Sequence, residues 1–225
     1  MDKSIIIGIA AIVAAGAAQA ATISWETAQN IAGDSDVSLS GTSVYAYSYG
    51  GTDETVNTQE FIGMDGSPGG NADIGLTFDR DGNPDTFAGT TTPFTSLTTG
   101  YQSLVGSSSW GRQVLTGTVT LNGLIIDQAY SVQIWMNDSR DRTDWNIRTS
   151  TLDGAAVDHN TTDAHGGLGQ YIIGTFTADA ASQDIAVVSL TAPQIAAIQL
   201  RAVPEPSSAA LLGLGGLALV LRRRK

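Results

Sequence analysis

Apolar and polar positions alternate with a period of two in several short stretches of this chain. In AYSVQIWMND, residues Tyr130, Val132, Ile134 and Met136 fall on one face. Similar alternation occurs in SVYAYSYG, QVLTGTVTLNGL, YIIGTFTAD, DIAVVSL and IAAIQLRAV, where β-branched and aromatic residues are frequent. This period is that of a β-strand with one buried face. The pattern therefore predicts a strand-rich protein.

Helical periodicity is scarce between these stretches, and the connections are rich in glycine and polar residues. Several short strands joined in this way predict an all-β fold, an antiparallel jelly-roll β-sandwich. In QVLTGTVTLNGL the alternation places Leu115, Gly117, Val119 and Leu121 on one side. The segments 50–75 and 79–100 read as long loops, which often carry function in a sandwich.

The N-terminal segment MDKSIIIGIAAIVAAGAAQA has the pattern of a secretory signal peptide. Lys3 supplies a basic start, residues 5–18 form an apolar run, and Ala18-Gln19-Ala20 matches a small-residue cleavage site. We expect a signal helix over residues 1–21, cut after Ala20 or Ala21. The alternative is a first transmembrane helix, for which the apolar run is short.

The chain ends in VPEPSSAALLGLGGLALVLRRRK, which contrasts with the polar sequence before it. Pro204 and Pro206 cannot continue a strand ladder, so we expect the sandwich domain to span residues 22–202. From Ser208 to Leu221 the chain is apolar, and as a helix it would span roughly 20 Å, short of a hydrocarbon core of roughly 30 Å. Flanking arginines can compensate by snorkelling, and the basic end favours a cytoplasmic position. This pattern predicts a C-terminal transmembrane helix.

The segment 203–225 resembles the PEP-CTERM sorting signal of bacteria with exosortase systems, a tail that also occurs on proteins described as ice-binding. The resemblance rests on the Pro-Glu-Pro triplet, the short apolar run and the terminal arginines, in that order. It implies processing by an exosortase-type membrane protease and a transient stay at the inner membrane, followed by a cell-surface or extracellular location. The residues that carry it are Pro204, Glu205, Pro206, Arg222, Arg223 and Arg224.

The body resembles, more loosely, galactose-binding-like or concanavalin-like β-sandwich domains that are exported with such tails. The resemblance rests on LIIDQAYSVQIWMNDSRDR and on the closing stretch IAAIQLR. It implies a jelly-roll body and surface roles in exopolysaccharide and biofilm. It carries over no individual ligand residue.

Charge narrows the choice of partners. The chain has 11 basic and 22 acidic residues, and residues 22–203 retain 6 of the basic and 20 of the acidic ones, with no lysine. Such a surface repels nucleic acid and anionic lipid. There is no cysteine, so disulfides and thiol catalysis are excluded.

Two motifs are candidates for ligand binding in the body. DRDGNPD places Asp79, Asp81, Asn83 and Asp85 at alternate positions, a spacing of oxygen ligands with which calcium loops begin. The glycine and the closing glutamate of an EF-hand are missing, and the same residue types also form ordinary turns. We therefore keep both a calcium site and a plain turn as interpretations.

The run WMNDSRDRTDW is the best candidate for a carbohydrate surface. Trp135 would stack on a sugar ring, while Asn137, Asp138 and Arg140 would bond its hydroxyl groups. The alternative is a strand end followed by a salt-bridged loop, with Trp135 in the core, since aromatic residues in strands usually pack.

Catalytic signatures are weak. The two histidines, His159 and His165, lie in a polar segment that reads as a hairpin loop, and no hydrolase or metalloprotease motif is present. Glycosidases need two apposed carboxylates, and no pair stands out. The sequence favours an exported, non-catalytic protein with a structural or adhesive role. A carbohydrate-binding module, with or without calcium, is the first alternative, and a glycoside hydrolase or polysaccharide lyase is the second.

Overall fold

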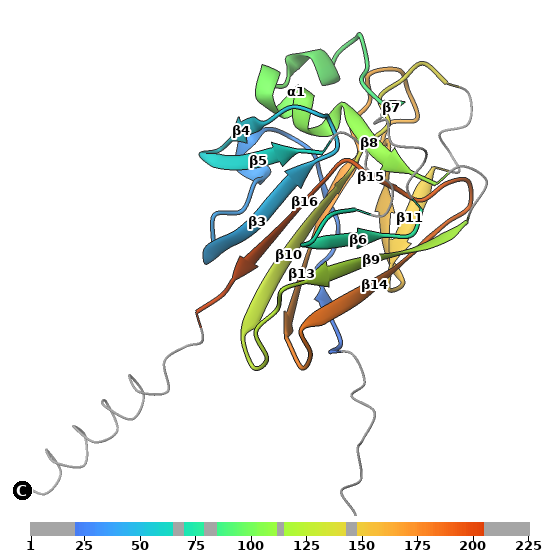
Figure 1. The fold of residues 1–225 in the computed structure, drawn as a ribbon. Coiled ribbons are helices and arrows are strands. Elements are labelled where there is room, and N and C mark those ends of the chain that lie inside the picture. Colours follow the sequence, from blue (N-terminus) through green and yellow to red (C-terminus); the bar gives the residue numbers. More distant parts are fainter. Residues whose placement is uncertain (1–20, 65–69, 79–84, 112–114, 143–147, 205–225) are drawn as a thin grey trace, which may run out of the picture.

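A computed structural model of the chain describes residues 21–64, 70–78, 85–111, 115–142 and 148–204. In this part, two β-sheets pack face to face, and a small third sheet lies at one end (Figure 1). The larger sheet consists of β1 (Ser24–Trp25), β2 (Gln29–Asn30), β3 (Thr42–Ser48), β4 (Glu54–Val56), β5 (Gln59–Gly63), β10 (Ala129–Met136), β13 (Gln170–Thr177) and β16 (Ala197–Ala202).

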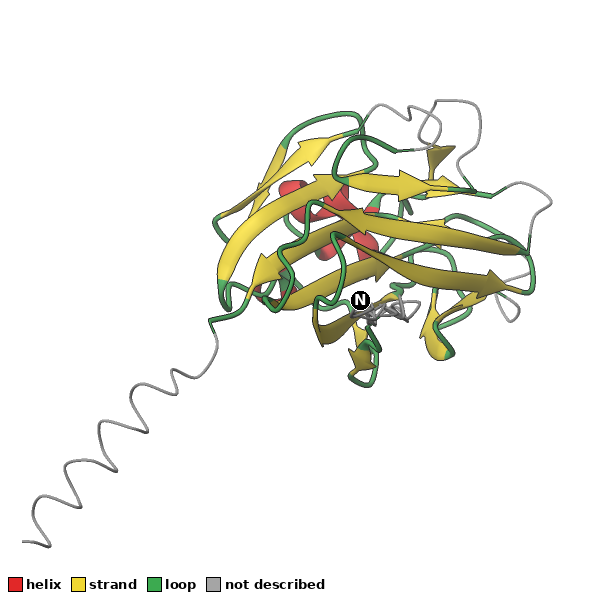
Figure 2. Cartoon of the chain, turned by 60° about the horizontal axis from the view of Figure 1, so that its bottom comes forward, coloured by secondary structure: helices red, strands yellow, loops and turns green. Residues whose placement is uncertain are grey.

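The second sheet has five strands, in the order β12-β11-β14-β9-β6. These are β6 (Ile74–Leu76), β9 (Thr116–Asn122), β11 (Thr149–Leu152), β12 (Ala155–Asp158) and β14 (Ser182–Ser189). The third sheet consists of β7 (Asp85–Thr86), β8 (Ser107–Trp110) and β15 (Gln194–Ile195). Three short helical elements complete the described chain, namely η1 (Asp34–Asp36), η2 (Phe94–Ser96) and α1 (Thr99–Val105), and Figure 2 shows how strands dominate.

The main core lies between the two large sheets and confirms the alternation seen in the sequence. Along β10, the four residues of the predicted inward face are at most 2% exposed: Tyr130, Val132, Ile134 and Met136. Val119 and Leu121 of β9 are buried opposite them, in the same cluster. Leu115, which the pattern placed with them, lies just before β9 begins and is exposed, so that part of the prediction is wrong.

A second core covers the other face of the larger sheet. Helix α1 begins after Thr98, whose hydroxyl oxygen accepts a hydrogen bond from the Tyr101 amide (3.3 Å). Tyr101 and Leu104 of this helix are buried against Phe61 and Trp135 of the sheet. The segment 79–100, read from the sequence as a long loop, therefore leads into a covering layer.

The β-sandwich prediction is confirmed, with one departure from a purely antiparallel arrangement. Strand β3 pairs with β5 in parallel, whereas the other pairs of described strands are antiparallel. The jelly-roll connection stays a prediction. In the described ranges, no helix combines the length and hydropathy needed to cross a bilayer. The predicted signal helix and C-terminal transmembrane helix lie outside the described residues.

The two ends of the described chain lie at the same end of the sandwich, away from α1 (Figure 1). The amide of Ala21 donates to a carboxylate oxygen of Asp179, in the turn between β13 and β14 (3.2 Å). The amide of Val203 donates to the carbonyl of Ala129, at the start of β10 (2.9 Å). We call this the tail end, and the opposite end, where β10 finishes, the helix end.

Candidate functional site

The chain turns inward at the helix end, directly after β10. Asn137, Asp138 and Ser139 are all fully buried. The Asn137 side chain donates to the carbonyl of Val105 (3.0 Å) and accepts from the amide of Gly169 (2.9 Å). These bonds join β10 to the end of α1 and to the segment before β13, so the amide of Asn137 holds three segments together.

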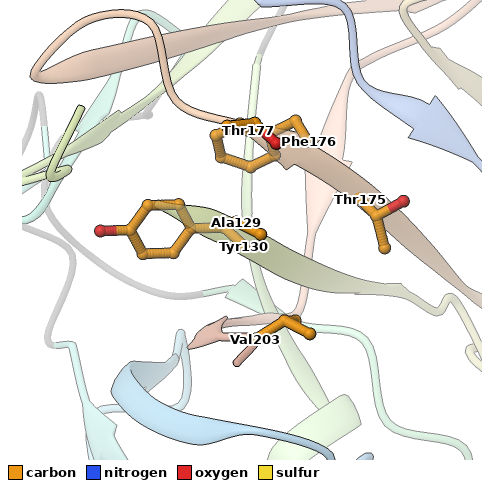
Figure 3. A pocket seen from close by; sticks show the side chains of 6 residues that line it. All are labelled: Ala129, Tyr130, Thr175, Phe176, Thr177 and Val203. Carbon is orange, nitrogen blue, oxygen red and sulfur yellow. The ribbon is translucent and has the colours of Figure 1, made fainter. Parts of the chain in front are cut away.

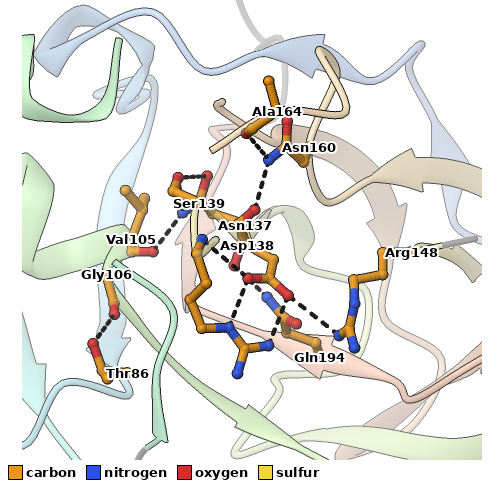
Figure 4. A network of polar contacts seen from close by, with 11 residues as sticks. Thr86, Val105, Gly106, Asn137, Asp138, Ser139, Arg148, Asn160, Ala164 and Gln194 are labelled. Atoms are coloured by element: carbon orange, nitrogen blue, oxygen red, sulfur yellow. Dashed lines mark hydrogen bonds and ion pairs between the residues drawn. The ribbon is translucent and has the colours of Figure 1, made fainter. Parts of the chain in front are cut away.

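Asp138 is the centre of a buried ionic group, drawn in Figure 4. Its carboxylate accepts from Nε of Arg140 (2.8 Å) and from Nη2 of the same side chain (2.7 Å). Nη1 of Arg148 lies 3.2 Å from Oδ2. The Arg140 guanidinium also lies over the ring of Phe87, 4.0 Å from its centre. Because two guanidinium groups surround the carboxylate, Asp138 is poorly placed to act as an acid, a base or a ligand.

Backbone groups around Asp138 are bonded as well. The side-chain amide of Asn160 donates to the carbonyl of Asp138 and to that of Ala164, both at 2.9 Å. The Gln194 side chain donates to the carbonyl of Asn137. The backbone carbonyl of His159 accepts from the Asp138 amide (2.7 Å). The network thus links the end of β10 to the loop after β12 and to β15.

His159 is fully buried next to this network. One ring nitrogen, Nε2, lies 2.9 Å from the Ser150 hydroxyl, while Nδ1 has no hydrogen-bond partner among the described residues. Burial lowers the pKa of His159 to about 4, an effect that Asp138 opposes and Arg148 adds to. A serine beside a histidine resembles part of a hydrolytic site, but both side chains are buried.

We expect His159 to make the protein sensitive to mild acid. The unfolded chain takes up this proton near pH 6.5 and the folded chain only near pH 4. The stabilisation is therefore complete above pH 6.5 and is lost at about 1.4 kcal/mol per pH unit as the pH falls toward 4. Urea unfolding between pH 4.5 and 8 measures this slope.

The matched control is the other histidine. His165 is partly exposed and contacts Thr90. We expect His159→Gln to flatten the pH dependence and His165→Gln to preserve it. Equal slopes for the wild type and His159→Gln would contradict the assignment.

The structure buries three of the four residues predicted to bind carbohydrate. Trp135 is 0% exposed, with its ring edge-on to Phe61 (centroids 5.6 Å apart) and its indole N–H donating to the Tyr101 hydroxyl (3.2 Å). The interpretation of Trp135 as a stacking platform is therefore wrong, because no ring face reaches the surface. Asn137 and Asp138 are buried too, and Arg140 is engaged with Asp138. The alternative of a strand end followed by a salt-bridged loop describes this run.

The predicted calcium loop lies mostly outside the described residues. This applies to Asp79, Asp81 and Asn83, whereas Asp85 begins β7. Among the described residues, no group of three or more histidine, aspartate or glutamate side chains is arranged to hold a metal ion. The calcium interpretation stays a prediction about residues 79–85.

At the tail end, the last residues before the Pro-Glu-Pro triplet are fixed to the fold. Strand β16 lies inside the larger sheet, between β10 and β3. The side-chain amide of Gln128 donates to the carbonyls of Ala129 and Val203, both at 2.9 Å. Pro204 follows and is exposed; Glu205, Pro206 and Arg222–Arg224 lie outside the described residues. The described fold therefore ends immediately before the motif.

Arg201 secures the same strand on its outer side. Its guanidinium donates to the carbonyls of Leu39, Ser40 and Gly41 and to the side-chain oxygen of Gln59, at 2.6–3.1 Å. Burial lowers the pKa of Arg201. Four neutral acceptors thus bond to this buried cation, and they tie the root of the tail to the segment before β3 and to β5.

A family model described as the PEP-CTERM protein-sorting motif matches residues 202–225. The tail is a PEP-CTERM sorting signal. The PEP-CTERM signal indicates a protein that an exosortase, itself a membrane protein, sorts for export or to the cell surface. Comparison with curated proteins and with solved structures finds no match. The galactose-binding-like or concanavalin-like resemblance of the body therefore stays a prediction.

We call the bonded group around Asn137 and Asp138 at the helix end the helix-end network. Most of its members could not be found from the sequence. Arg148, His159, Asn160 and Gln194 are far from Asp138 along the chain, and nothing local in the sequence connects them. The density of charges in NDSRDR was the available signal, and it pointed to the loop but not to its partners.

Proposed function

We propose that this protein is a non-catalytic structural or adhesive component of the cell surface or extracellular matrix. The PEP-CTERM signal at residues 202–225, joined directly to β16 of a folded body, is the observation that carries the proposal. The body supports it, since its most conspicuous polar group, around Asp138, is occupied by internal bonds. Surface polysaccharide is the partner class that we propose.

The acidic surface favours the same role. Of the arginines in the described body, Arg140 and Arg148 are paired with Asp138, Arg201 is buried, and Arg142 is partly exposed. Exposed carboxylates therefore dominate over exposed cations on this part of the chain. A surface of this kind stays soluble and avoids nucleic acid and anionic lipid.

Mass spectrometry of the native chain tests the sorting step. We expect a mature C-terminus near Pro204 and a location outside the inner membrane. Replacing Pro204, Glu205 and Pro206 together by alanine should leave the chain ending at Lys225 in the inner-membrane fraction, because the protease would lose its motif. Glu60→Ala, an exposed carboxylate in the body, is the control and should be processed normally. Complete processing of the triple variant would contradict the role of the motif.

The role of the mature body needs a separate test. Deletion of the gene should weaken biofilm cohesion or release exopolysaccharide from the cells. The purified mature protein should then release no sugar from that polysaccharide. Sugar release would instead establish a glycoside hydrolase or lyase. Specific glycan binding without any change in cohesion would establish a carbohydrate-binding module.

A further inference from the structure

The loop between β9 and β10 exposes two consecutive isoleucines at the tail end. Ile125 is 68% exposed and Ile126 is 56% exposed. The other large apolar side chains exposed on the described body, such as Leu190, do not occupy adjacent positions in the chain, and exposure of adjacent apolar residues often marks a contact site.

The loop that carries them is well ordered by its hydrogen bonds. The amide of Ile125 donates to the Tyr130 hydroxyl (3.0 Å), and its carbonyl accepts from the Gln128 amide (3.1 Å). The amide of Asp127 donates to the carbonyl of Ala178, in the neighbouring turn (2.8 Å). The two isoleucines are therefore held outward by a fixed backbone.

The same loop is bonded to the root of the tail. The Gln128 side chain, two residues after Ile126, donates to the carbonyl of Val203 (2.9 Å). From Val203 to the start of the apolar run at Ser208 the chain has five residues, which can reach at most about 18 Å. Whenever that run enters a membrane, Val203 and the Gln128 side chain bonded to it therefore lie within about 18 Å of the start of the run, which keeps the loop within reach of the lipid surface.

A hollow of about 260 Å³ lies at the same end of the body, where β10 begins and β13 and β16 end, as Figure 3 shows. It is lined by Ala129, Tyr130, Thr175, Phe176, Thr177 and Val203. None of these side chains is charged, so the lining of the hollow itself does not resist contact with lipid.

We propose that Ile125 and Ile126 insert into the lipid surface while the tail is still attached. This inference rests on the proposed sorting function, which places the tail in a membrane before processing. The tether supplies a high local concentration, and the isoleucines supply the apolar contact typical of interfacial anchors. The contact orients the body with its tail end down and the helix end, with α1, away from the membrane.

Charge predicts which lipid the loop prefers. Asp127 and Asp179 are both exposed at this end. Their carboxylates repel anionic head groups. Contact of the loop should therefore be strongest on neutral phosphatidylcholine and should weaken as phosphatidylglycerol is added. The comparison is made at low salt, because salt screens the repulsion and would remove the difference between the two lipids.

The chain has no cysteine, so a single introduced cysteine can be labelled cleanly. We would label the full chain with an environment-sensitive fluorophore at Ile126→Cys and add phosphatidylcholine vesicles. Leu190→Cys is the matched control, since Leu190 is 72% exposed and follows the end of β14 away from the tail end. Val220→Cys, in the apolar run of the tail, reports insertion of the tail itself.

We expect a blue shift at positions 126 and 220 and quenching by spin-labelled lipid at both, with no change at 190. A shift at 220 with an aqueous label at 126 would overturn the inference and leave the proposed sorting function standing. A label at position 220 that stays in water would show that the tail does not enter the bilayer, and it would contradict both the lipid contact and the proposed sorting function. A label at 126 that becomes dry only when exosortase is present would also overturn it, because the loop would then contact the protease.

A second variant keeps the test independent of the label. On vesicles, contact with lipid should slow hydrogen exchange in the loop of the wild type. The double variant Ile125→Ser with Ile126→Ser should lose this slowing without unfolding the body, because both side chains are exposed. Circular dichroism checks the fold. Unchanged hydrogen exchange of residues 124–128 on vesicles, for this double variant and for the wild type alike, would contradict the contact.

Discussion

Asp138→Asn should lower the free energy of unfolding by about 3–5 kcal/mol, the usual loss when one partner of a buried ion pair is removed. Because this substitution nearly preserves the volume of the side chain, a loss of stability would report on charge and hydrogen bonding, not on packing. Arg140 and Arg148 would both lose the Asp138 carboxylate, which lies 2.7 Å and 3.2 Å from their guanidinium groups. Arg148 is nearly buried, with a side chain 10% exposed, so water can compensate little.

Asp141→Asn is the matched control, because Asp141 is an exposed aspartate in the same loop. We expect it to change stability by no more than about 0.5 kcal/mol. Urea unfolding at pH 7.5, in low salt and in 1 M salt, measures both variants. The loss at Asp138 should persist in 1 M salt, because a buried pair is screened much less than an exposed one. Equal effects of the two substitutions would show that the network does not hold the helix end together.

The helix-end network has consequences for how such a surface protein keeps its shape. Asn137 and Asp138 connect β10 of the larger sheet to α1, to the loop after β12 and to β15. Without cysteine, the body has no disulfide to fix these long connections. Buried polar bonds take that place: the side chains of Asn137, Asp138 and Asn160 each bond to two or more groups, so the network stabilises one arrangement of the loops.

The fold could be predicted as far as local periodicity reaches. The alternation in AYSVQIWMND identified the inward face of β10, because a strand with one face on a core repeats every two residues. Trp135 falls on the opposite face, and periodicity alone would put it toward solvent. A second layer, formed by α1 and its neighbours, covers that face. Nothing in β10 itself reveals a layer that comes from residues 94–105.

The signal for that layer was present but weak. Tyr101, Leu104 and Val105 are spaced as on one face of a helix, after a capping Thr98. Seven residues are too few for a confident helix, and the surrounding glycines and threonines favour a loop interpretation. The sorting signal, in contrast, is contiguous, so the order of its parts could be read without any tertiary information.

The ionic group could not be predicted for a different reason. Asp138 and Arg140 are neighbours, so their pairing was within reach of local reasoning. Arg148, just before β11, and His159, just after β12, come together because those two strands pair, and the His159 carbonyl then accepts from the Asp138 amide. Pairings of this kind depend on strand order, which alternation does not determine.

Trp135→Ala should cost about 3–5 kcal/mol of stability, as for other large aromatic residues removed from a core. Its ring packs against Phe61 and Tyr171, with centroids 5.6 Å and 6.3 Å apart, and without the indole N–H the Tyr101 hydroxyl oxygen loses a hydrogen-bond donor. Trp135→Phe should cost less, because it keeps most of the packing, and the Tyr101 hydroxyl still donates to Asp36 (2.9 Å). Leu190→Ala, at an exposed apolar position, should change stability by no more than about 0.5 kcal/mol.

The same series separates a core role of Trp135 from a role in sugar recognition. Thermal unfolding and glycan binding would be measured on each variant. If Trp135 has only a core role, any glycan binding of the mature protein should persist in Trp135→Phe. In Trp135→Ala, that binding should be lost only where the fold is lost as well. An alanine variant that unfolds like the wild type but no longer binds glycan would contradict the buried position. The core assignment also implies that carbohydrate contacts, where the body makes them, come from side chains other than the indole of Trp135.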